Sequence, residues 1–163
     1  MKVLQDSAAN SGRPHIQVLL IFFRTSQILR RSERWVNRTV LGMAVSAVYR
    51  SLGLFVFGID IPVSTRIGPG LAIHHGMGLV VHNGTIIGSD VTLRHNTTVG
   101  SKKNGRAPQI GDRVDIGPNS CVIGEVMIGD DSRIGAGSVV VRDVASSETV
   151  AGNPARSLQS RNL

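Results

Sequence analysis

The 163-residue sequence is poor in aromatic residues and in cysteine, which argues against an aromatic core and against intrachain disulfides. Phe, Trp and Tyr make up 4% of the chain, which argues against a core built on large aromatic side chains. The single cysteine, Cys121, cannot form an intrachain disulfide, which fits a reducing compartment. The apolar run 18–23 is too short for a secretory signal, and Arg50 and several glycines interrupt the longer run 39–59, which disfavours a membrane span. We therefore expect a cytoplasmic protein.

Positive charge is concentrated at the start of the chain. Residues 1–58 contain eight Lys or Arg and two acidic residues, a balance of +6, whereas the remainder contains ten and nine, a balance of +1. The two parts therefore look like different structures. We expect an N-terminal helical arm at 1–58, a second domain at 59–156 and a C-terminal tail at 157–163.

An internal repeat of six residues dominates the second part. Ten of the twelve intervals between successive apolar positions are six residues long, glycine follows seven of these positions, and a small or β-branched residue usually lies four further on. A helix would repeat near 3.6 residues and a hairpin sheet every two, so the pattern predicts short strands joined by turns, with three strands in each triangular coil and a little over four coils. The thirteen positions are Ile61, Ile67, Ile73, Val81, Ile87, Leu93, Val99, Ile110, Ile116, Val122, Ile128, Ile134 and Val140.

The repeat is interrupted first between Ile73 and Val81, where two extra residues bring His74 and His75 next to glycines. We expect a bulged corner with exposed imidazoles, which suit general-base work near neutral pH. Asp60 lies fifteen residues before His75, close to one coil of about eighteen, and could orient it. His95 lies twenty residues after His75, or eighteen once the insertion is subtracted, so it is expected at the same face one coil further on.

A second interruption adds five residues around 100–108, and its Gly and Asn content predicts an extended loop. Lys102, Lys103 and Arg106 could contact an anionic ligand there or simply be solvated.

These features resemble the hexapeptide-repeat family, and residues 57–156 are similar to serine acetyltransferases and, more closely, to exopolysaccharide O-acetyltransferases of the colanic-acid type. The resemblance implies a mainly β fold, a left-handed parallel β-helix of hexapeptide repeats with an N-terminal α-helical segment. Handedness comes from the family, because the general rule for parallel crossovers predicts the opposite hand. The segments that carry the resemblance are Gly58–Ile61, Ile73–Gly76, Thr92–His95, Ile134–Val140 and Ala151–Arg156.

The same resemblance implies site residues. His75 matches the catalytic base of serine acetyltransferases and Asp60 its partner, with the same spacing. The family's serine-binding Asp and Arg match His74 and Arg106, and the family's next His is replaced by Ala107, so two acceptor-contacting positions differ. Acetyl-CoA is the implied co-substrate, without a metal, bound in the groove between the β-helices of a homotrimer. The matching cofactor positions are Ser101, Pro118, Ala136, Asn153, Pro154 and Arg156.

The implied function is transfer of acetyl to a hydroxyl of a polysaccharide or glycan precursor; the alternative is a serine O-acetyltransferase of cysteine biosynthesis. His95 is either an acceptor-binding residue or a ladder residue bonded to the backbone. Three less favoured hypotheses are a β-helix scaffold without activity, an acyl-carrying Cys121, and a carbonic-anhydrase-like zinc site. The zinc site would use His74, His75, His82 and His95.

The basic arm has apolar residues at rough helical spacing over 16–29 and a second apolar stretch at 40–57. Such helices cap the open first coil, whose strand edge is otherwise unpaired, or lie peripherally on the anionic inner face of a membrane, and the two roles are compatible. No nucleic-acid-reading module accompanies the basic residues, so no nucleic acid is expected. The arginines assigned to the polar face are Arg24, Arg30, Arg31, Arg34 and Arg38.

Overall fold

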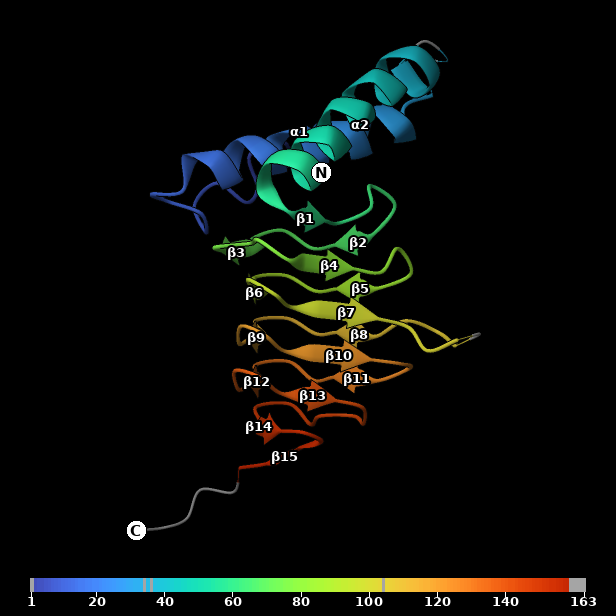
Figure 1. The fold of residues 1–163 in the computed structure, drawn as a ribbon. Coiled ribbons are helices and arrows are strands. Elements are labelled where there is room, and N and C mark those ends of the chain that lie inside the picture. The colour runs from blue at the N-terminus through green and yellow to red at the C-terminus, as the bar shows by residue number, and fades with distance from the viewer. Residues whose placement is uncertain (1, 34, 36, 104, 159–163) are drawn as a thin grey trace.

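A computed structural model describes residues 2–33, 35, 37–103 and 105–158, and it consists of a helical segment followed by a stack of short strands (Figure 1). Arg34 and most of the expected C-terminal tail lie outside the described residues. The helical segment contains α1 (Pro14–Arg31), η1 (Asn37–Leu41), α2 (Gly42–Ser51) and η2 (Leu52–Phe57). The strands are β1 (Ile59–Asp60), β2 (Arg66–Ile67), β3 (Ala72–His74), β4 (Leu79–Val81), β5 (Ile86–Ile87), β6 (Thr92–Arg94), β7 (Thr98–Gly100), β8 (Gln109–Ile110), β9 (Asp115–Ile116), β10 (Cys121–Ile123), β11 (Met127–Ile128), β12 (Arg133–Ile134), β13 (Val139–Val140), β14 (Thr149–Gly152) and β15 (Ala155–Ser157).

The strands form three sheets, one on each side of the coil. The first sheet has the order β1-β4-β7-β10-β13, the second β11-β8-β5-β2 and the third β15-β14-β12-β9-β6-β3, so each strand pairs with the strand one coil away. Every pairing is parallel except that of β14 with β15. The predicted fold class, a parallel β-helix with an N-terminal helical segment, is confirmed.

The hexad positions fill the interior of the coil. All thirteen predicted apolar positions are buried, and so are the small or β-branched residues four positions later, such as Thr65 and Ser138. The first sheet contains five strands, slightly more coil than the thirteen hexads indicated. The difference arises because the chain has already formed β1 before Ile61 and continues beyond Val140 to Val150, outside the six-residue rhythm.

Polar side chains of the helical segment bond to the open edge of the first coil, which confirms the capping interpretation. Asp6 Oδ1 accepts a hydrogen bond from the Leu71 N–H at 3.0 Å, and Asn10 Oδ1 accepts one from the Ile73 N–H at 3.0 Å. The Gln27 side-chain amide donates to the Val63 and Thr65 carbonyls, and the Tyr49 hydroxyl to the Ile61 carbonyl at 2.7 Å. These bonds satisfy backbone groups that no further strand is present to pair.

The assignment of Arg24 to a polar, solvent-facing side of its helix was wrong. Its side chain is fully buried and forms a two-point ion pair with Asp6, with N···O distances of 2.7 and 3.1 Å. The same guanidinium donates to the Ile67 carbonyl at 2.8 Å and to the Gly68 carbonyl at 2.7 Å. A planar group with five N–H donors can satisfy a carboxylate and two carbonyls at once, which explains why arginine is tolerated at this position.

The two main helices pack side by side across the end of the coil (Figure 1). The inward face of α2 and η2 presents the small residues Gly42, Ser46 and Gly53. Tyr49 lies on the same face, and the centroid of its ring is 5.4 Å from that of Phe23. The helical stretch Thr39–Phe57 is long and apolar enough to cross a membrane by length and composition, and 22% of it is buried.

Candidate active site

His75 occupies the bulged corner between β3 and β4, as the insertion in the repeat predicts. Its backbone is left-handed, with φ of +53°, and its side chain is exposed. The next residue, Gly76, is buried against the coil: a Cβ there would lie 2.6 Å from Ile59 Cδ1 and from Ile73 Cγ2. The backbone therefore presses against the core at Gly76 and turns the imidazole of His75 outward.

Asp60 lies on the coil that precedes this corner. In β1 it pairs with Val80 of β4, while its neighbour Ile59 points into the core, so the carboxylate projects from the opposite face of the strand. The Gly78 N–H donates to the Gly58 carbonyl at 2.8 Å, which ties the corner to the start of β1. No hydrogen bond joins the side chains of Asp60 and His75 within the described residues. Asp60 therefore lies two residues from the point where β1 is tied to the corner, on the coil next to His75.

Burial, followed by the nearby charge of Asp60, raises the pKa of the Tyr49 hydroxyl well above its ordinary value. The charge of Asp60 therefore acts on Tyr49 of α2.

His95 lies at the same corner on the following coil. Strands β3 and β6 pair with His74 opposite Arg94, so His75 and His95 leave their strands together, as the spacing predicts. The Nδ1 atom of His95 is buried and has no hydrogen-bond partner among the described residues. A buried, unpaired imidazole nitrogen is costly, and a bound water or a ligand group would supply its missing partner.

His74 has a positively charged environment. The pKa of its imidazole is lowered, first by burial and then by the charges of Arg13, Arg94 and His75. Arg94 forms an ion pair with Asp115, and Arg13 donates to the Ile73 carbonyl at 3.3 Å. The lowered pKa favours the neutral form of the His74 imidazole, and Arg94 lies opposite it in the strand register.

A pocket of about 260 Å³ opens beside His75 where the helical segment meets the coil. His15 from the first turn of α1, Phe57 from the end of η2, and Met77 from the corner contribute to its walls. His15 was not among the predicted site residues, and no spacing rule indicates it because sixty residues separate it from His75. The pocket is mostly apolar, and two histidines, His15 and His75, are among the residues that line it.

Several of the predicted cofactor positions fall at two corners of the coil, one at each end of the strands of the first sheet. Each row of corners forms one lengthwise edge of the β-helix. Pro118 and Ala136 lie at the edge that carries the His75 corner, where Asn119 N–H donates to the His95 carbonyl at 3.1 Å and Gly137 N–H to the Pro118 carbonyl at 2.9 Å. Ser101 and Arg106 lie at the opposite edge, after β7, and exposed Arg106 approaches Glu125 at 3.4 Å. Within one chain the two groups are therefore not brought together. Asn153, Pro154 and Arg156 are exposed at the turn and strand that end the stack.

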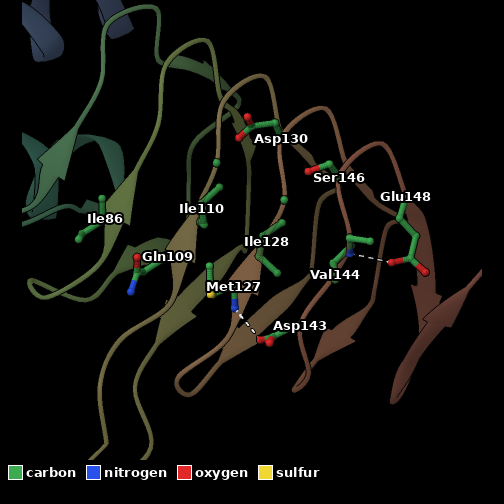
Figure 2. Close-up of a pocket in the computed structure, with 13 residues that line it drawn as sticks. Ile86, Gln109, Ile110, Met127, Ile128, Asp130, Asp143, Val144, Ser146 and Glu148 are labelled. Atoms are coloured by element: carbon green, nitrogen blue, oxygen red, sulfur yellow. Dashed lines mark hydrogen bonds between the residues drawn. The ribbon is translucent and has the colours of Figure 1, made fainter.

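A larger pocket, about 730 Å³, lies elsewhere, on the second sheet (Figure 2). Ile86, Gln109 and Met127 line it together with acidic residues, but none of the predicted site residues does. Two of its carboxylates are already used: Asp143 accepts from the Met127 N–H and Glu148 from the Ala145 N–H, both at 2.8 Å. We place the site at the smaller pocket because it contains the imidazoles.

The part of the chain that the structure describes offers no specific support for the zinc or the cysteine hypothesis. Across the described residues, no group of three or more His, Cys, Asp and Glu is arranged to hold a metal ion. His82 lies apart in a turn, where its Nδ1 accepts from the Gly84 N–H at 3.0 Å. Cys121 pairs with Thr98 and Val139, neither of which activates a thiol.

A parallel β-helix with a histidine exposed at a bulged corner fits an acyltransferase of the hexapeptide-repeat family, and the comparisons with known proteins show that family. Residues 107–142 match the family model described as bacterial transferase hexapeptide (six repeats). The chain is 38% identical over 167 residues to serine acetyltransferase of Helicobacter pylori strain 26695, covering 96% of this chain and 92% of that one. It is 31% identical over 160 residues to the "Putative colanic acid biosynthesis acetyltransferase WcaB" of Escherichia coli K12, covering 94% and 97%.

Solved structures agree with these relatives. Soybean serine acetyltransferase superposes with a TM-score of 0.79 at 31% identity, covering 96% of this chain and 67% of that one. A serine acetyltransferase in complex with CoA gives a TM-score of 0.77 at 26% identity, covering 96% and 68%. The chain belongs to the hexapeptide-repeat family of acetyltransferases that includes the serine acetyltransferases, and it is an acetyltransferase.

Replacing Gly76 with alanine is expected to distort the corner that carries His75. The new methyl group would meet Ile59 and Ile73 at 2.6 Å, so the corner must shift, at a cost of about 1–3 kcal/mol of folding stability and with a fall in kcat. Thermal unfolding and CoA-release assays measure the two effects. Gly100→Ala is the control, because its nearest contact would be an ordinary 3.4 Å. Equal activity of the two variants would contradict the importance of this contact.

Proposed function

We propose that the protein is an acetyl-CoA-dependent O-acetyltransferase whose acceptor is a hydroxyl of a polysaccharide or glycan precursor, and that it acts in the cytoplasm. The observation that carries the choice of acceptor is His74, an imidazole whose pKa is lowered by burial and by the charges of Arg13 and Arg94. At this position the serine acetyltransferase pattern has a carboxylate, which would receive the ammonium group of serine.

An ammonium group is poorly accommodated beside His74. Two guanidinium groups repel a cation, and the only carboxylate among the charged neighbours that affect His74, Asp115, is already paired with Arg94. A sugar carries hydroxyls and no ammonium, and a neutral imidazole can both donate to and accept from hydroxyls. The site therefore favours a glycan acceptor over a free amino acid.

The proposed chemistry is direct transfer by general-base catalysis. His75 removes the proton of the acceptor hydroxyl as its oxygen bonds to the thioester carbonyl carbon, and the carbon–sulfur bond then breaks so that CoA leaves. The imidazolium returns its proton to the departing thiolate. Asp60 approaches to stabilise the imidazolium, since catalytic hydrogen bonds are often formed only in the substrate complex. His95 has an unpaired Nδ1 available for a substrate group.

We also propose that the complete site forms between subunits of a homotrimer. The edge of one β-helix that carries His75, Pro118 and Ala136 would face the edge of its neighbour that carries Ser101 and Arg106, with the CoA arm between them. This arrangement accounts for the division of the predicted residues between two edges of one chain. Arg156, with Asn153 and Pro154, would meet the adenine end of the cofactor.

A second candidate, serine O-acetyltransferase, is favoured by the 38% identity to the Helicobacter pylori enzyme. Release of CoA from acetyl-CoA, measured with L-serine and separately with lipid-linked and free oligosaccharide precursors, separates the two. Turnover of the glycan with kcat/KM well above that for serine supports the first function. Efficient turnover of serine alone would overturn it.

Replacing His74 with aspartate is expected to shift the acceptor preference. The carboxylate would offer serine a charge-assisted hydrogen bond, worth about 1.5–3 kcal/mol, and so raise kcat/KM for serine about tenfold or more while lowering it for the glycan. His74→Asn, similar in size but uncharged, is the matched control and should leave serine turnover unchanged. A His74→Asp enzyme with an unaltered preference would show that this position does not contact the acceptor.

A further inference from the structure

The outward face of the helical stretch Thr39–Phe57 is apolar although it is uncovered. Phe55 is 86% exposed, Met43 61% and Val48 45%. With Val40 and Leu54 they follow helical spacing, so the exposed apolar groups form one continuous stripe, here called the outer stripe. Helices of water-soluble proteins usually place charged or polar residues on such a face. The outer stripe therefore has the composition of a buried surface without a covering element.

Only the outward face of this helix is free to contact another surface, because its inward face is already packed against the rest of the protein. The opposite face of the helix packs against α1 through Gly42, Ser46 and Tyr49. Helix α1 in turn places Arg24 and Gln27 against backbone carbonyls of the first coil. Crossing a bilayer would require these polar contacts to be given up, whereas contact with a surface leaves all of them intact.

Charge indicates what kind of surface fits. Arg50 is exposed on the same helix, and Arg30 and Arg31 at the end of α1 are exposed with no ion-pair partner among the described residues. The arm carries +6 in total, and one of its two acids, Asp6, is consumed by Arg24. A symmetric contact between two copies would bring like charges together, while anionic headgroups would neutralise them.

The outer stripe also leads to the candidate active site. Its last residues adjoin Val56 and Phe57, which line the pocket that contains His75. We propose that the outer stripe lies on an anionic membrane surface, and that it presents a lipid-linked glycan acceptor to His75. Presentation of a lipid-linked acceptor rests on the proposed function, whereas the membrane contact itself does not.

Sedimentation of the purified full-length protein with vesicles tests the contact without acetyl-CoA or acceptor. We expect strong binding to vesicles of phosphatidylcholine mixed with phosphatidylglycerol, weaker binding to phosphatidylcholine alone, and loss of binding at high salt. Phe55→Ser should weaken binding about tenfold or more, because a large apolar side chain no longer enters the lipid. Arg50→Glu should weaken binding to the anionic vesicles only.

Met127→Ser is the matched control, since Met127 is 62% exposed on the β-helix, away from the arm. Circular dichroism verifies that each variant is folded. Equal binding of Phe55→Ser and wild type, or no binding of wild type to anionic vesicles, would overturn the proposal. Sedimentation velocity tests for contact between copies of the chain. If the wild type forms a larger assembly that Phe55→Ser dissociates, and neither protein binds vesicles, the outer stripe is an interface between copies and the membrane proposal is wrong.

Activity then distinguishes this proposal from the proposed function. Phe55→Ser should acetylate a free oligosaccharide as fast as wild type but a vesicle-bound acceptor several-fold more slowly. If vesicles bind yet no glycan is acetylated, the glycan function fails and the membrane contact stands. If free glycan is acetylated yet vesicles do not bind, only the membrane contact fails.

Discussion

Replacing His75 with alanine is expected to lower kcat for acetyl transfer by about two to four orders of magnitude, the contribution of a positioned general base. The side chain is exposed at a corner and makes no hydrogen bond to the rest of the described protein, so folding stability should barely change. CoA binding should also persist, because the proposed cofactor contacts lie at other positions. Release of CoA, measured under saturating acetyl-CoA and acceptor, gives kcat, and calorimetry gives cofactor affinity.

His82→Ala is the control for this experiment. His82 is also an exposed histidine in a turn, and it accepts only a local hydrogen bond from Gly84. Its loss should leave kcat unchanged. If His75→Ala retained ordinary activity, the base would have to be another group, and the assignment of the corner as the active site would be wrong.

Replacing Arg24 with methionine is expected to cost about 3–5 kcal/mol of folding stability, because it leaves the Asp6 carboxylate buried without its partner. The Ile67 and Gly68 carbonyls also lose their donor. For a chain of this length the loss corresponds to a decrease in Tm of about 6–20 °C. Thermal unfolding followed by circular dichroism measures it.

A matched comparison is available on the surface of the coil. Arg113 forms a two-point ion pair with Asp131 at 2.7 and 2.8 Å, similar in geometry to that of Arg24 but exposed to solvent. Arg113→Met should change Tm little, since water solvates the carboxylate that remains. Comparable losses in the two variants would show that the buried pair does not specifically hold the helical cap in place.

The β-helix could be predicted closely because its coil repeats one local pattern. Each hexad places an apolar residue inward independently of the others, so a count along the chain identifies residues as distant as Ile61 and Val140 as core. The bulged corner was predicted for the same reason, since an insertion into a regular repeat must leave the regular path. The placement of His95 one coil after His75 was predicted from their separation in the sequence, once the two inserted residues were subtracted.

The helical cap could not be predicted in this way. Arg24 looks solvent-facing from its spacing, yet it is among the most deeply buried side chains, because its partners Asp6 and Ile67 come from distant parts of the chain. His15 reaches the pocket of His75 for a similar reason: a helix lies across the end of the coil. No period in the sequence reports such a contact.

The local sequence pattern was therefore sufficient to predict the coil, its inward-facing residues and the corner that carries His75. The burial of an ion pair, the pocket between helix and coil, and the distribution of the proposed cofactor residues over two edges depend on how separate segments pack. The physical reason is the range of the interactions. The six-residue unit of strand and turn is determined by residues that are close in sequence, whereas many hydrogen bonds of the cap join groups 43 to 65 residues apart.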